Sequence, residues 1–356
     1  MLKKEDYICM TPFTYTEVFD DQQTLCCNNW LDKDFDIKIT DSIKDNFYSE
    51  KAQRIRESIL DGSYSHCNER TCPYLNGLKN GASSYGATLV KNTPANREWA
   101  RKEARPKMVN FCFDRSCNLA CPSCRTEFIN VHGKERQSVE DKMRQVDEEL
   151  CHDIEIMYLS GTADPFFSNS YRKFLVNLDP KKYPKLIKIH LHTNANLWTK
   201  AFWKKLHKIH HLIISCEISI DASCKETYDI VRKGGDWDKL IDNLKFIVTI
   251  PTIETFHFSM VVSDDNYKEM LDFYNLINNI FMEYAPKAEW DIFYNKLTDW
   301  GTFTPEVYKK KAVFEEDHEL FSDFQFQLGR IKHLKNITTN FNLKQMEEAQ
   351  GFVKVI

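Results

Sequence analysis

The sequence predicts an α/β protein built on a partial (β/α)6 barrel. Between residues 108 and 293, short apolar or β-branched runs alternate with longer segments of helical periodicity, which is typical of βαβ units and a parallel sheet. Six such runs suit a TIM-like barrel or partial barrel, in which the chemistry lies at the carboxyl ends of the strands. Hydrophobic residues make up 42% of the chain and charged residues 28%, which is typical of a globular protein and argues against disorder.

The expected elements follow in order along the chain. The predicted strands span residues 108–113, 154–159, 186–191, 212–220, 255–262 and 289–293. The predicted helices span residues 97–105, 142–151, 171–178, 201–210, 237–248 and 267–280, with a last helix and a polar tail from about residue 315. A polar stretch at 76–106 separates a cysteine-rich beginning from the strand–helix region. We therefore expect a small domain at 1–100, the barrel at 101–310 and a C-terminal helix and tail at 311–356.

Charge and hydropathy exclude several classes of partner. The chain has 48 Lys and Arg against 52 Asp and Glu, and the net charge of −4 disfavours nucleic acid or an anionic membrane as the main partner. No apolar run approaches the roughly 18 residues of a membrane span. Acidic residues near the start replace the apolar core of a signal peptide, so a cytoplasmic location is expected. Grouped cysteines in such a chain more often bind metal than form disulfides.

Three cysteines directly after the first predicted strand form the tightest group. Cys117, Cys121 and Cys124 follow the pattern C-x3-C-x2-C. Three thiolates can hold a [4Fe–4S] cluster while leaving one iron open to a small molecule. A zinc site would explain the same cysteines if a fourth ligand were near, and three unrelated buried thiols are the remaining alternative.

Small and polar residues follow the predicted strands at their carboxyl ends. Taken singly, such residues are also explained as helix caps, turns or surface charges. Their order, each after a successive strand, favours one shared ligand site. They are Ser160, Gly161, Thr162, Asp164, Asn194, Ser219 and Asp221. Arg232 follows farther along after the fourth strand, and Val261 lies on the fifth predicted strand.

The cysteine motif and these strand ends together resemble the radical S-adenosylmethionine (SAM) superfamily. The resemblance implies that Cys117, Cys121 and Cys124 hold a [4Fe–4S] cluster whose open iron chelates SAM. One electron then cleaves SAM to a 5′-deoxyadenosyl radical, which abstracts a hydrogen atom from the substrate. The resemblance also implies an external electron donor such as flavodoxin or ferredoxin.

The same resemblance implies particular contacts to SAM. The amino group would be held by residues 160–164, the ribose by Ser219 and Asp221, the carboxylate by Arg232 and the adenine by Val261. A guanidinium suits a carboxylate because it can donate two parallel hydrogen bonds. Many family members carry an aromatic residue before the third cysteine, where this chain has Ser123. We therefore expect Phe113, Phe166 or the fifth strand to support the adenine.

An earlier group of cysteines resembles the SPASM/twitch modules that accompany many radical SAM enzymes. The resemblance implies that Cys9, Cys27, Cys67 and Cys72 ligate one auxiliary [4Fe–4S] cluster, although the module usually follows the barrel. A four-cysteine zinc site would explain the same spacing. Cys26 competes with Cys27 as a ligand, because adjacent residues of a strand face opposite ways.

The resemblance narrows the expected function to a few reactions. SPASM/twitch enzymes oxidise, epimerise or cross-link peptides, or dehydrogenate sugars and other small alcohols. A separate leader-peptide-binding domain is not evident, which favours a sugar or other small molecule over a peptide. One alternative is a non-catalytic iron–sulfur or zinc scaffold or electron carrier with a degenerate SAM site. A methylthiolating enzyme acting on RNA or protein also uses two clusters, but it usually adds a basic RNA-binding module, which the charge balance disfavours.

Overall fold

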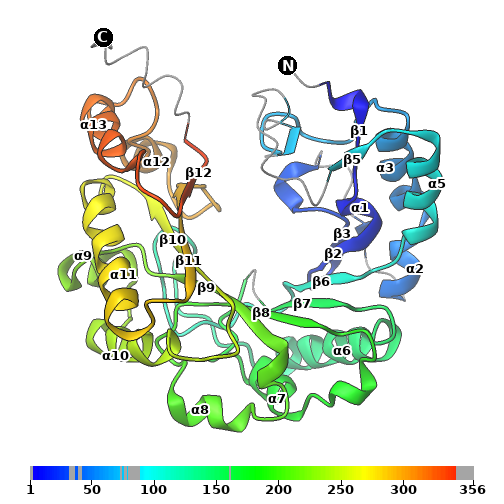
Figure 1. Ribbon diagram of the computed structural model, residues 1–356, viewed down its shortest axis with the longest axis horizontal. Helices are drawn as coiled ribbons and strands as arrows, with labels where there is room; N and C mark the ends of the chain where they lie inside the picture. The colour runs from blue at the N-terminus through cyan, green and yellow to red at the C-terminus, as the bar shows by residue number, and fades with distance from the viewer. Residues whose placement is uncertain are drawn as a thin grey trace. The chain divides into compact units, whose positions relative to one another are not determined.

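The structure, a computed structural model, describes residues 3–31, 37–38, 42–72, 74–75, 78, 89–159 and 162–341. The chain forms two compact units (Figure 1). The first unit comprises Met1–Arg115, Val131–Ala163 and Asn177–His190. The second unit comprises Ser116–Asn130, Asp164–Val176 and Leu191–Ile356.

The first unit contains a mixed sheet in which β2 pairs in parallel with β6 and β6 pairs in parallel with β7. On the other side of β2, β3 and β4 continue the sheet in antiparallel fashion. These strands are β2 (Tyr15–Val18), β3 (Gln22–Thr24), β4 (Ile37–Lys38), β6 (Met108–Phe111) and β7 (Ile156–Leu159). A separate antiparallel pair is formed by β1 (Tyr7–Cys9) and β5 (Leu89–Lys91).

The helices of the first unit begin at recognisable capping residues. The Ser49 hydroxyl accepts a hydrogen bond from the backbone N–H of Ala52 at the start of α3, and the Thr93 hydroxyl caps α5, whose first residue is Pro94. The apolar face of α3 packs into a hydrophobic cluster with β1 and the early cysteines. The helices are α1 (Thr11–Thr14), α2 (Ile43–Phe47), α3 (Glu50–Leu60), α5 (Pro94–Glu103) and α6 (Gly133–Glu149).

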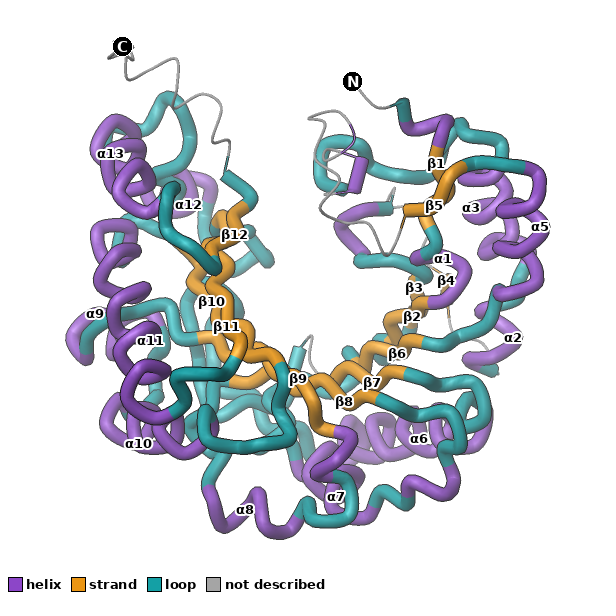
Figure 2. Tube along the Cα trace, viewed as in Figure 1, coloured by secondary structure: helices purple, strands orange, loops and turns teal. Residues whose placement is uncertain are grey.

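The second unit contains parallel strands with helices on one side of them. β9 (Ile213–Ser219), β10 (Thr255–Val262), β11 (Glu289–Lys296) and β12 (Ile337–Thr339) pair in this order, all in parallel. Figure 2 shows α9 (Lys225–Val231), α10 (Trp237–Ile247) and α11 (Met270–Tyr284) beside these strands. The remaining helices are α7 (Asn169–Asn177), α8 (Lys200–Lys205), α12 (Pro305–Lys311) and α13 (Phe321–Ile331). The strand β8 (Lys188–Thr193) runs along the chain from the first unit into the second.

The structure confirms the predicted α/β class with a mostly parallel sheet, together with the six expected strands. The helix expected at 142–151 begins earlier, at Gly133. Its first turns are mostly charged and bury only Val139, so they lack the apolar periodicity by which the sequence would have revealed them. The short strands β2 and β12 were not expected. The last expected helix is α13, and no helix among the described residues is long and apolar enough to cross a membrane.

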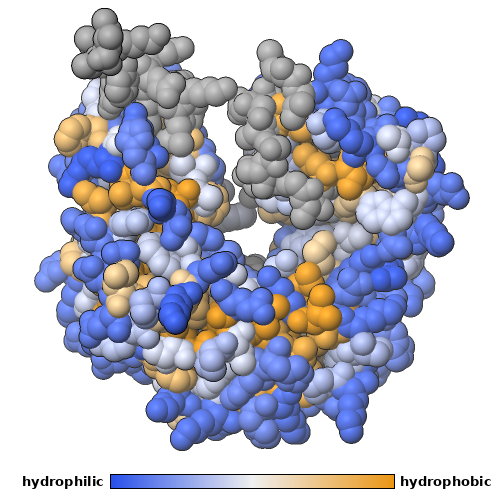
Figure 3. Space-filling view, viewed as in Figure 1, coloured by the Kyte–Doolittle hydropathy of each residue, from blue (hydrophilic) through white to orange (hydrophobic). Residues whose placement is uncertain are grey.

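The surface agrees with the ordinary globular composition. Figure 3 shows hydrophilic side chains over most of the visible face, with apolar side chains in separate patches. Within the second unit, alternate residues of β10 enter the core: Phe256, Phe258 and Met260 are almost fully buried. The intervening residues face the other side of the sheet, which is therefore free to carry polar groups.

Candidate functional site

The cysteine motif lies on a loop after β6, within the second unit. Cys117 is half-buried, Cys121 is buried and Cys124 is exposed. The loop is held by backbone hydrogen bonds from Cys117 N–H to the Ile129 carbonyl (2.9 Å) and from Cys124 N–H to the Cys121 carbonyl (2.9 Å). The three thiols are therefore presented by a loop with fixed backbone geometry.

Each of the three sulfur atoms accepts a hydrogen bond from a nitrogen donor. The donors are Leu119 N (3.4 Å) and Asn194 Nδ2 (3.7 Å) to Cys117, Arg232 Nη1 (3.7 Å) to Cys121 and Arg125 Nη2 (3.5 Å) to Cys124. Donors of this kind stabilise thiolate charge and tune the potential of iron–sulfur clusters. Burial raises the pKa of Cys117 to about 12 and also raises that of Cys121, so both thiols stay protonated at neutral pH in the metal-free protein. A bound metal would displace these protons. The donor set fits a thiolate-ligated cluster.

Direct metal coordination is not preformed by these side chains. Across the part of the chain that the structure describes, no three His, Cys, Asp or Glu side chains converge as a metal site, and this includes the cysteine motif. Ligand side chains have to rotate together when metal binds, which is common where metal binding and local ordering are coupled.

Asp164 lies after β7, and its buried side chain holds the end of β8 in place. Its carboxylate accepts hydrogen bonds from Phe166 N–H (2.9 Å), the Thr193 hydroxyl (2.8 Å) and Asn194 N–H (2.9 Å). Burial raises the pKa of Asp164, and these donors oppose the shift. The side chain thus fixes the end of β8 and is committed to protein donors.

The loop after β8 is held in a strained conformation. Ala195 has a φ of 60°, in the left-handed region that residues with a Cβ rarely adopt. The buried Asn243 amide donates to the carbonyls of Ala195 (2.8 Å) and Asn196 (3.0 Å), and Asn196 in turn donates to the Tyr228 hydroxyl (2.6 Å). This network presents Asn194 to Cys117 and, through a 2.9 Å hydrogen bond, to Asn118.

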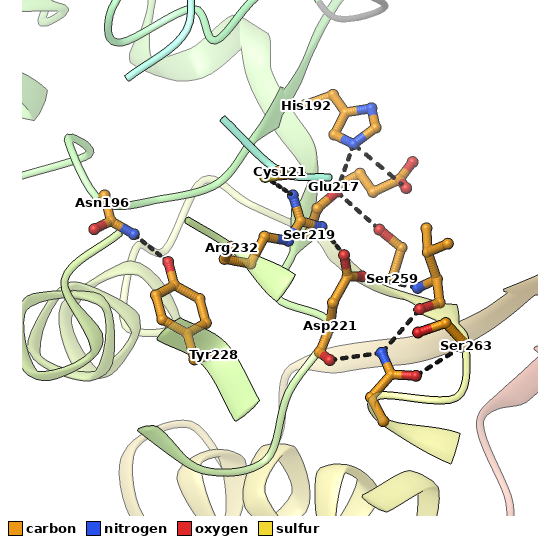
Figure 4. A network of polar contacts seen from close by, with 12 residues as sticks. Cys121, His192, Asn196, Glu217, Ser219, Asp221, Tyr228, Arg232, Ser259 and Ser263 are labelled. Carbon is orange, nitrogen blue, oxygen red and sulfur yellow. Dashed lines mark hydrogen bonds and ion pairs between the residues drawn. The ribbon is translucent and has the colours of Figure 1, made fainter. Parts of the chain in front are cut away.

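Asp221 and Arg232 form a buried ion pair beside the cysteine loop. Asp221 has a φ of 62°, and its carboxylate lies 2.8 Å from Arg232 Nη2 and accepts the Val261 N–H at 2.8 Å. Burial raises the pKa of Asp221, while the Arg232 guanidinium opposes the shift. Because Arg232 also donates to Cys121, it joins the end of β9 to the cysteine motif (Figure 4).

One donor of Arg232 has no partner among the described residues. Its Nε is buried and has no hydrogen-bond acceptor, and the side chain as a whole is only 12% exposed. A buried donor without an acceptor costs about 1–3 kcal/mol or more, so such atoms often mark the place of a ligand. An anionic acceptor at this point would satisfy the Arg232 donor.

A chain of polar side chains continues from Asp221 along the sheet face (Figure 4). His192 Nε2 lies 2.8 Å from the Ser219 hydroxyl and 3.6 Å from Glu217 Oε1, and the Ser219 hydroxyl lies 2.9 Å from the Ser259 hydroxyl. These residues come from β8, β9 and β10. Ser219 therefore joins side chains of three strands at a point two residues before Asp221.

This group of polar side chains extends sideways over β10 and β11. Glu217 and His257 are register partners on β9 and β10, and His257 is the register partner of Asp291 on β11, with His257 Nδ1 2.8 Å from Asp291 Oδ2. The side chains of His192, Glu217, His257 and Asp291 are 30–36% exposed. We call these four residues, with Ser219 and Ser259, the polar face. It can donate to and accept from several groups of a ligand at once.

A small pocket lies beside Asp221. Val231, Val261, Leu297 and Phe303 contribute apolar walls, and Ser123 of the cysteine loop lies at its edge. The pocket gives Val261 a place in the site. Leu297 and Phe303 carried no signal in the sequence, because they follow a strand in a loop of no recognisable pattern.

Comparison with known families identifies the domain that carries this geometry. Residues 113–277 match the sequence model of the Radical SAM superfamily. This segment is similar to a radical SAM domain. The match indicates SAM-dependent radical chemistry for this segment and leaves the reaction open.

Two solved structures show a distant similarity to the chain. The chain is similar to Streptococcus suis SuiB bound to precursor peptide SuiA, with 14% identity and a TM-score of 0.42 over 75% of this chain and 61% of that chain. It is also similar to TYW1 with a lysine–pyruvate adduct bound, with 10% identity and a TM-score of 0.39 over 63% of this chain and 72% of that chain. The chain thus spans less than two thirds of SuiB. No curated protein matches the sequence.

The residues expected to bind SAM in the radical SAM domain divide into three groups. Hydrogen bonds, ion pairs or a shared pocket bring together Cys117, Cys121, Asn194, Ser219, Asp221, Arg232 and Val261. Ser160 and Gly161 lie outside the described residues, whereas the Thr162 hydroxyl donates to the carbonyls of Cys112 (2.9 Å) and Asp114 in the first unit. Asp164 lies next to the site without presenting its carboxylate to it.

The aromatic residues considered for the adenine lie in cores. Phe166 stacks on Trp198 with ring centroids 4.8 Å apart and is 1% exposed. Phe113 packs against Phe111 in the first unit. The fifth predicted strand is left as the expected support, through Val261.

The early cysteines lie in the first unit. Cys9, Cys26 and Cys72 are members of one buried hydrophobic cluster, and Cys67 packs against it. Cys27 is half-buried, and neither that cluster nor the side chains packed on it include Cys27 among the described residues. Cys26, and not Cys27, is therefore a member of the hydrophobic cluster to which Cys9 and Cys72 belong.

Proposed function

We propose that the protein reductively cleaves SAM to a 5′-deoxyadenosyl radical that abstracts a hydrogen atom from a polar substrate. The observation that carries the proposal is Arg232, which links the cysteine loop at Cys121 to Asp221 at the end of β9 and keeps a buried Nε donor unpaired. A [4Fe–4S] cluster on Cys117, Cys121 and Cys124 would supply the electron for cleavage when bound. The family match over residues 113–277 supports this chemistry.

The side chains around the loop would hold SAM against the open side of the motif. The unpaired Nε of Arg232 suits an anionic oxygen such as the SAM carboxylate. Asn194 and Ser219 lie at neighbouring strand ends and offer an amide and a hydroxyl. The adenine ring would lie against Val261, next to the apolar side chains of Val231, Leu297 and Phe303. Asp164 acts as a positioning residue, because it fixes Asn194 without reaching a ligand.

The polar face supports a substrate rich in hydroxyl or amino groups. It combines two imidazoles, two carboxylates and two hydroxyls, and no Lys or Arg forms an ion pair with Glu217 or Asp291 among the described residues. Such groups hydrogen-bond to hydroxyls and ammonium groups. We propose oxidation, epimerisation or cross-linking of a sugar or other small polar molecule, with a peptide as the alternative. The electron donor would be a flavodoxin or ferredoxin, and no nucleic acid or membrane partner is proposed.

The early cysteines would hold a second, auxiliary [4Fe–4S] cluster, with zinc as the alternative metal. Three of them are buried together in an apolar cluster, where thiolates fit a bound metal better than they fit free charges. An auxiliary cluster at this place could exchange an electron with the substrate radical or anchor the substrate.

The experiment is anaerobic reconstitution followed by iron and zinc counts and an assay for 5′-deoxyadenosine after dithionite reduction. The wild type is compared with a Cys117→Ala/Cys121→Ala/Cys124→Ala variant, with Cys216→Ala, a buried core thiol, as the matched control. We expect 5′-deoxyadenosine from the wild type and the control only. Iron binding by the wild type with no SAM cleavage, also in the presence of cell extract as a source of substrate, would favour the non-catalytic scaffold.

A further inference from the structure

Tyr64 ties the strand that carries Cys9 to the turn that carries Cys67. Its hydroxyl accepts a hydrogen bond from Cys9 N–H at 3.2 Å and donates to the Tyr7 carbonyl at 2.8 Å. Its own carbonyl accepts from Cys67 N–H at 3.0 Å. Tyr64 is 2% exposed, so this junction lies inside the hydrophobic cluster. Cys9 and Cys67 are thereby anchored to one buried residue.

The same turn is tied to the segment that follows Cys26 and to Cys72. Leu31 forms an isolated antiparallel bridge with Cys67, and Asn68 N–H donates to the Trp30 carbonyl at 2.8 Å. Cys72 N–H donates to the Asn68 carbonyl at 2.9 Å. Three backbone segments that are distant in sequence are thus held together by hydrogen bonds around the thiols of the cluster.

The backbone around Cys26 and Cys27 is fixed on both sides. The buried Thr24 hydroxyl donates to the Cys26 carbonyl at 2.7 Å, and Asn28 N–H donates to the Glu17 carboxylate at 3.3 Å. Cys27 is the N-cap residue of a short 3-10 helix, Asn28–Trp30. Because the Cys26 carbonyl and the Asn28 N–H are both anchored, the side chains of Cys26 and Cys27 cannot exchange places without breaking these hydrogen bonds.

The two thiols point into different surroundings. Cys26 is 6% exposed and belongs to the cluster with Cys9 and Cys72. Cys27 lies within electrostatic range of Cys112, which follows β6 and is also close to Glu17. Cys27 is not a member of the apolar cluster, and the N–H of the residue after it donates to the Glu17 carboxylate on β2.

We infer that Cys26, and not Cys27, completes a four-cysteine metal site with Cys9, Cys67 and Cys72. The inference rests on the proposed auxiliary metal and names its fourth ligand. Four thiolates in an apolar setting suit a [4Fe–4S] cluster or a structural zinc ion. Cys27 is left outside this site, beside Cys112.

The electrostatic surroundings of Cys26 agree with this geometry. The thiols of Cys9, Cys72 and Cys67 lie within electrostatic range of Cys26, as does that of the adjacent Cys27. Among the described residues the thiols do not converge as a metal site, so their side chains would turn toward one another when metal binds.

The test uses full-length protein in which Cys117→Ala, Cys121→Ala and Cys124→Ala remove the SAM-cluster ligands, so that bound metal reports the early cysteines alone. Cys26→Ala and its neighbour Cys27→Ala are compared in this background after anaerobic reconstitution with iron and sulfide. Iron, sulfide and zinc are counted, and the visible absorption spectrum is recorded. We expect the parent and the Cys27→Ala variant to bind the same metal, and Cys26→Ala to lose at least about 80% of it.

The possible results distinguish the assignment of Cys26 as a ligand from the proposed auxiliary metal site itself. Loss of metal in Cys27→Ala with retention in Cys26→Ala would overturn the ligand assignment, as would retention in both. Absence of metal from the parent would overturn the auxiliary site itself while leaving SAM cleavage by the wild type untouched. Zinc in place of iron, lost only with Cys26, would support the assignment. Because Cys26 is buried, Cys26→Ser and far-UV circular dichroism of both variants distinguish ligand loss from unfolding.

Discussion

At the residue scale, the buried Asp221–Arg232 ion pair is the contact whose loss should lower the free energy of unfolding most. The two side chains are 3% and 12% exposed and lie 2.8 Å apart. Removing one partner of a buried ion pair leaves the other charge uncompensated and typically costs 3–5 kcal/mol. We therefore expect Asp221→Asn to lower the free energy of unfolding by about 3 kcal/mol, measured by chemical denaturation, and to abolish SAM cleavage.

A double substitution separates the ion pair from other effects at the same position. Asp221→Asn combined with Arg232→Met removes both charges, and we expect it to recover part of the lost stability without recovering SAM cleavage. Equal stability of Asp221→Asn and the wild type would show that the pair contributes little. Full SAM cleavage by the double variant would show that Arg232 does not hold the ligand.

Thiol reactivity provides a second test at the residue scale. Burial in the core of β9 raises the pKa of Cys216, whereas Cys124 is exposed on the cysteine loop. Because the thiolate is the reactive form, metal-free folded protein at pH 8 should be alkylated by iodoacetamide at Cys124 at least about 100-fold faster than at Cys216. Raising the pH through 9, the ordinary thiol value, should leave Cys216 unreactive until the protein unfolds. Mass spectrometry of peptides follows both sites, and comparable rates would contradict the burial of Cys216.

Individual site residues differ in how far the sequence could reveal them. Cys117, Cys121 and Cys124 are local in sequence, so their spacing alone indicates a shared ligand. Whether a carboxylate faces a ligand or backbone donors depends on the fold, and for this reason Asp164 and Asp221 looked alike although only Asp221 pairs with Arg232. His192 and Glu217 meet only because β8 and β9 lie next to each other in the fold, which no sequence spacing states.

At the element scale, helix α10 supports the end of β8 through one side chain. The buried Asn243 amide satisfies the carbonyls of Ala195 and Asn196. Replacing it by alanine leaves two buried carbonyls unpaired, and we expect Asn243→Ala to cost about 2 kcal/mol or more of stability and to weaken SAM binding. Asp242→Asn, next to it on the exposed side of the helix, should change stability by less than about 0.5 kcal/mol. Thermal unfolding and equilibrium dialysis with SAM measure both, and equal behaviour of the two variants would refute the role of Asn243.

The turn between α9 and α10 depends on the absence of a side chain at Gly235. A Cβ atom there would lie 2.5 Å from Tyr228 Cε1 and 2.6 Å from its hydroxyl oxygen. Tyr228 is fully buried, so its ring cannot move aside freely. We expect Gly235→Ala to cost about 1–3 kcal/mol and to increase amide exchange around Asn196, which donates to the Tyr228 hydroxyl. The exposed neighbour Lys233→Ala is the control, and unchanged exchange in Gly235→Ala would rule out the predicted clash.

Helices and strands were predictable where their hydrophobic periodicity was strong. The strands β8 to β11 carry apolar runs of sufficient length, and their existence follows from the sequence. β2 is four residues long, has the two polar residues Thr16 and Glu17 at its centre and pairs with β6 across more than 90 residues of sequence. Such a strand is stabilised by its partner rather than by its own composition, so the sequence alone did not reveal it.

At the scale of the whole molecule, each unit has its own proposed metal site, so metal removal should act on one unit at a time. In the variant lacking Cys117, Cys121 and Cys124, chelation of the remaining metal should speed amide exchange in peptides around Cys9 and Cys67 by at least about tenfold, equivalent to about 1.4 kcal/mol. Peptides from β9 and β10 should keep their protection. Hydrogen exchange with mass spectrometry measures both, and equal deprotection of β9 and β10 would contradict independent metal sites.

The adjacent thiols of Cys26 and Cys27 have a consequence for comparing related sequences. A shift of one position in an alignment exchanges the two cysteines without opening a gap or changing the number of cysteines. A profile that scores this column by residue type would therefore record a preserved ligand in a relative that keeps only the wrong thiol. The anchors on either side, Thr24 and the Glu17–Asn28 contact, are better guides to the correct column, because they fix which cysteine enters the apolar cluster.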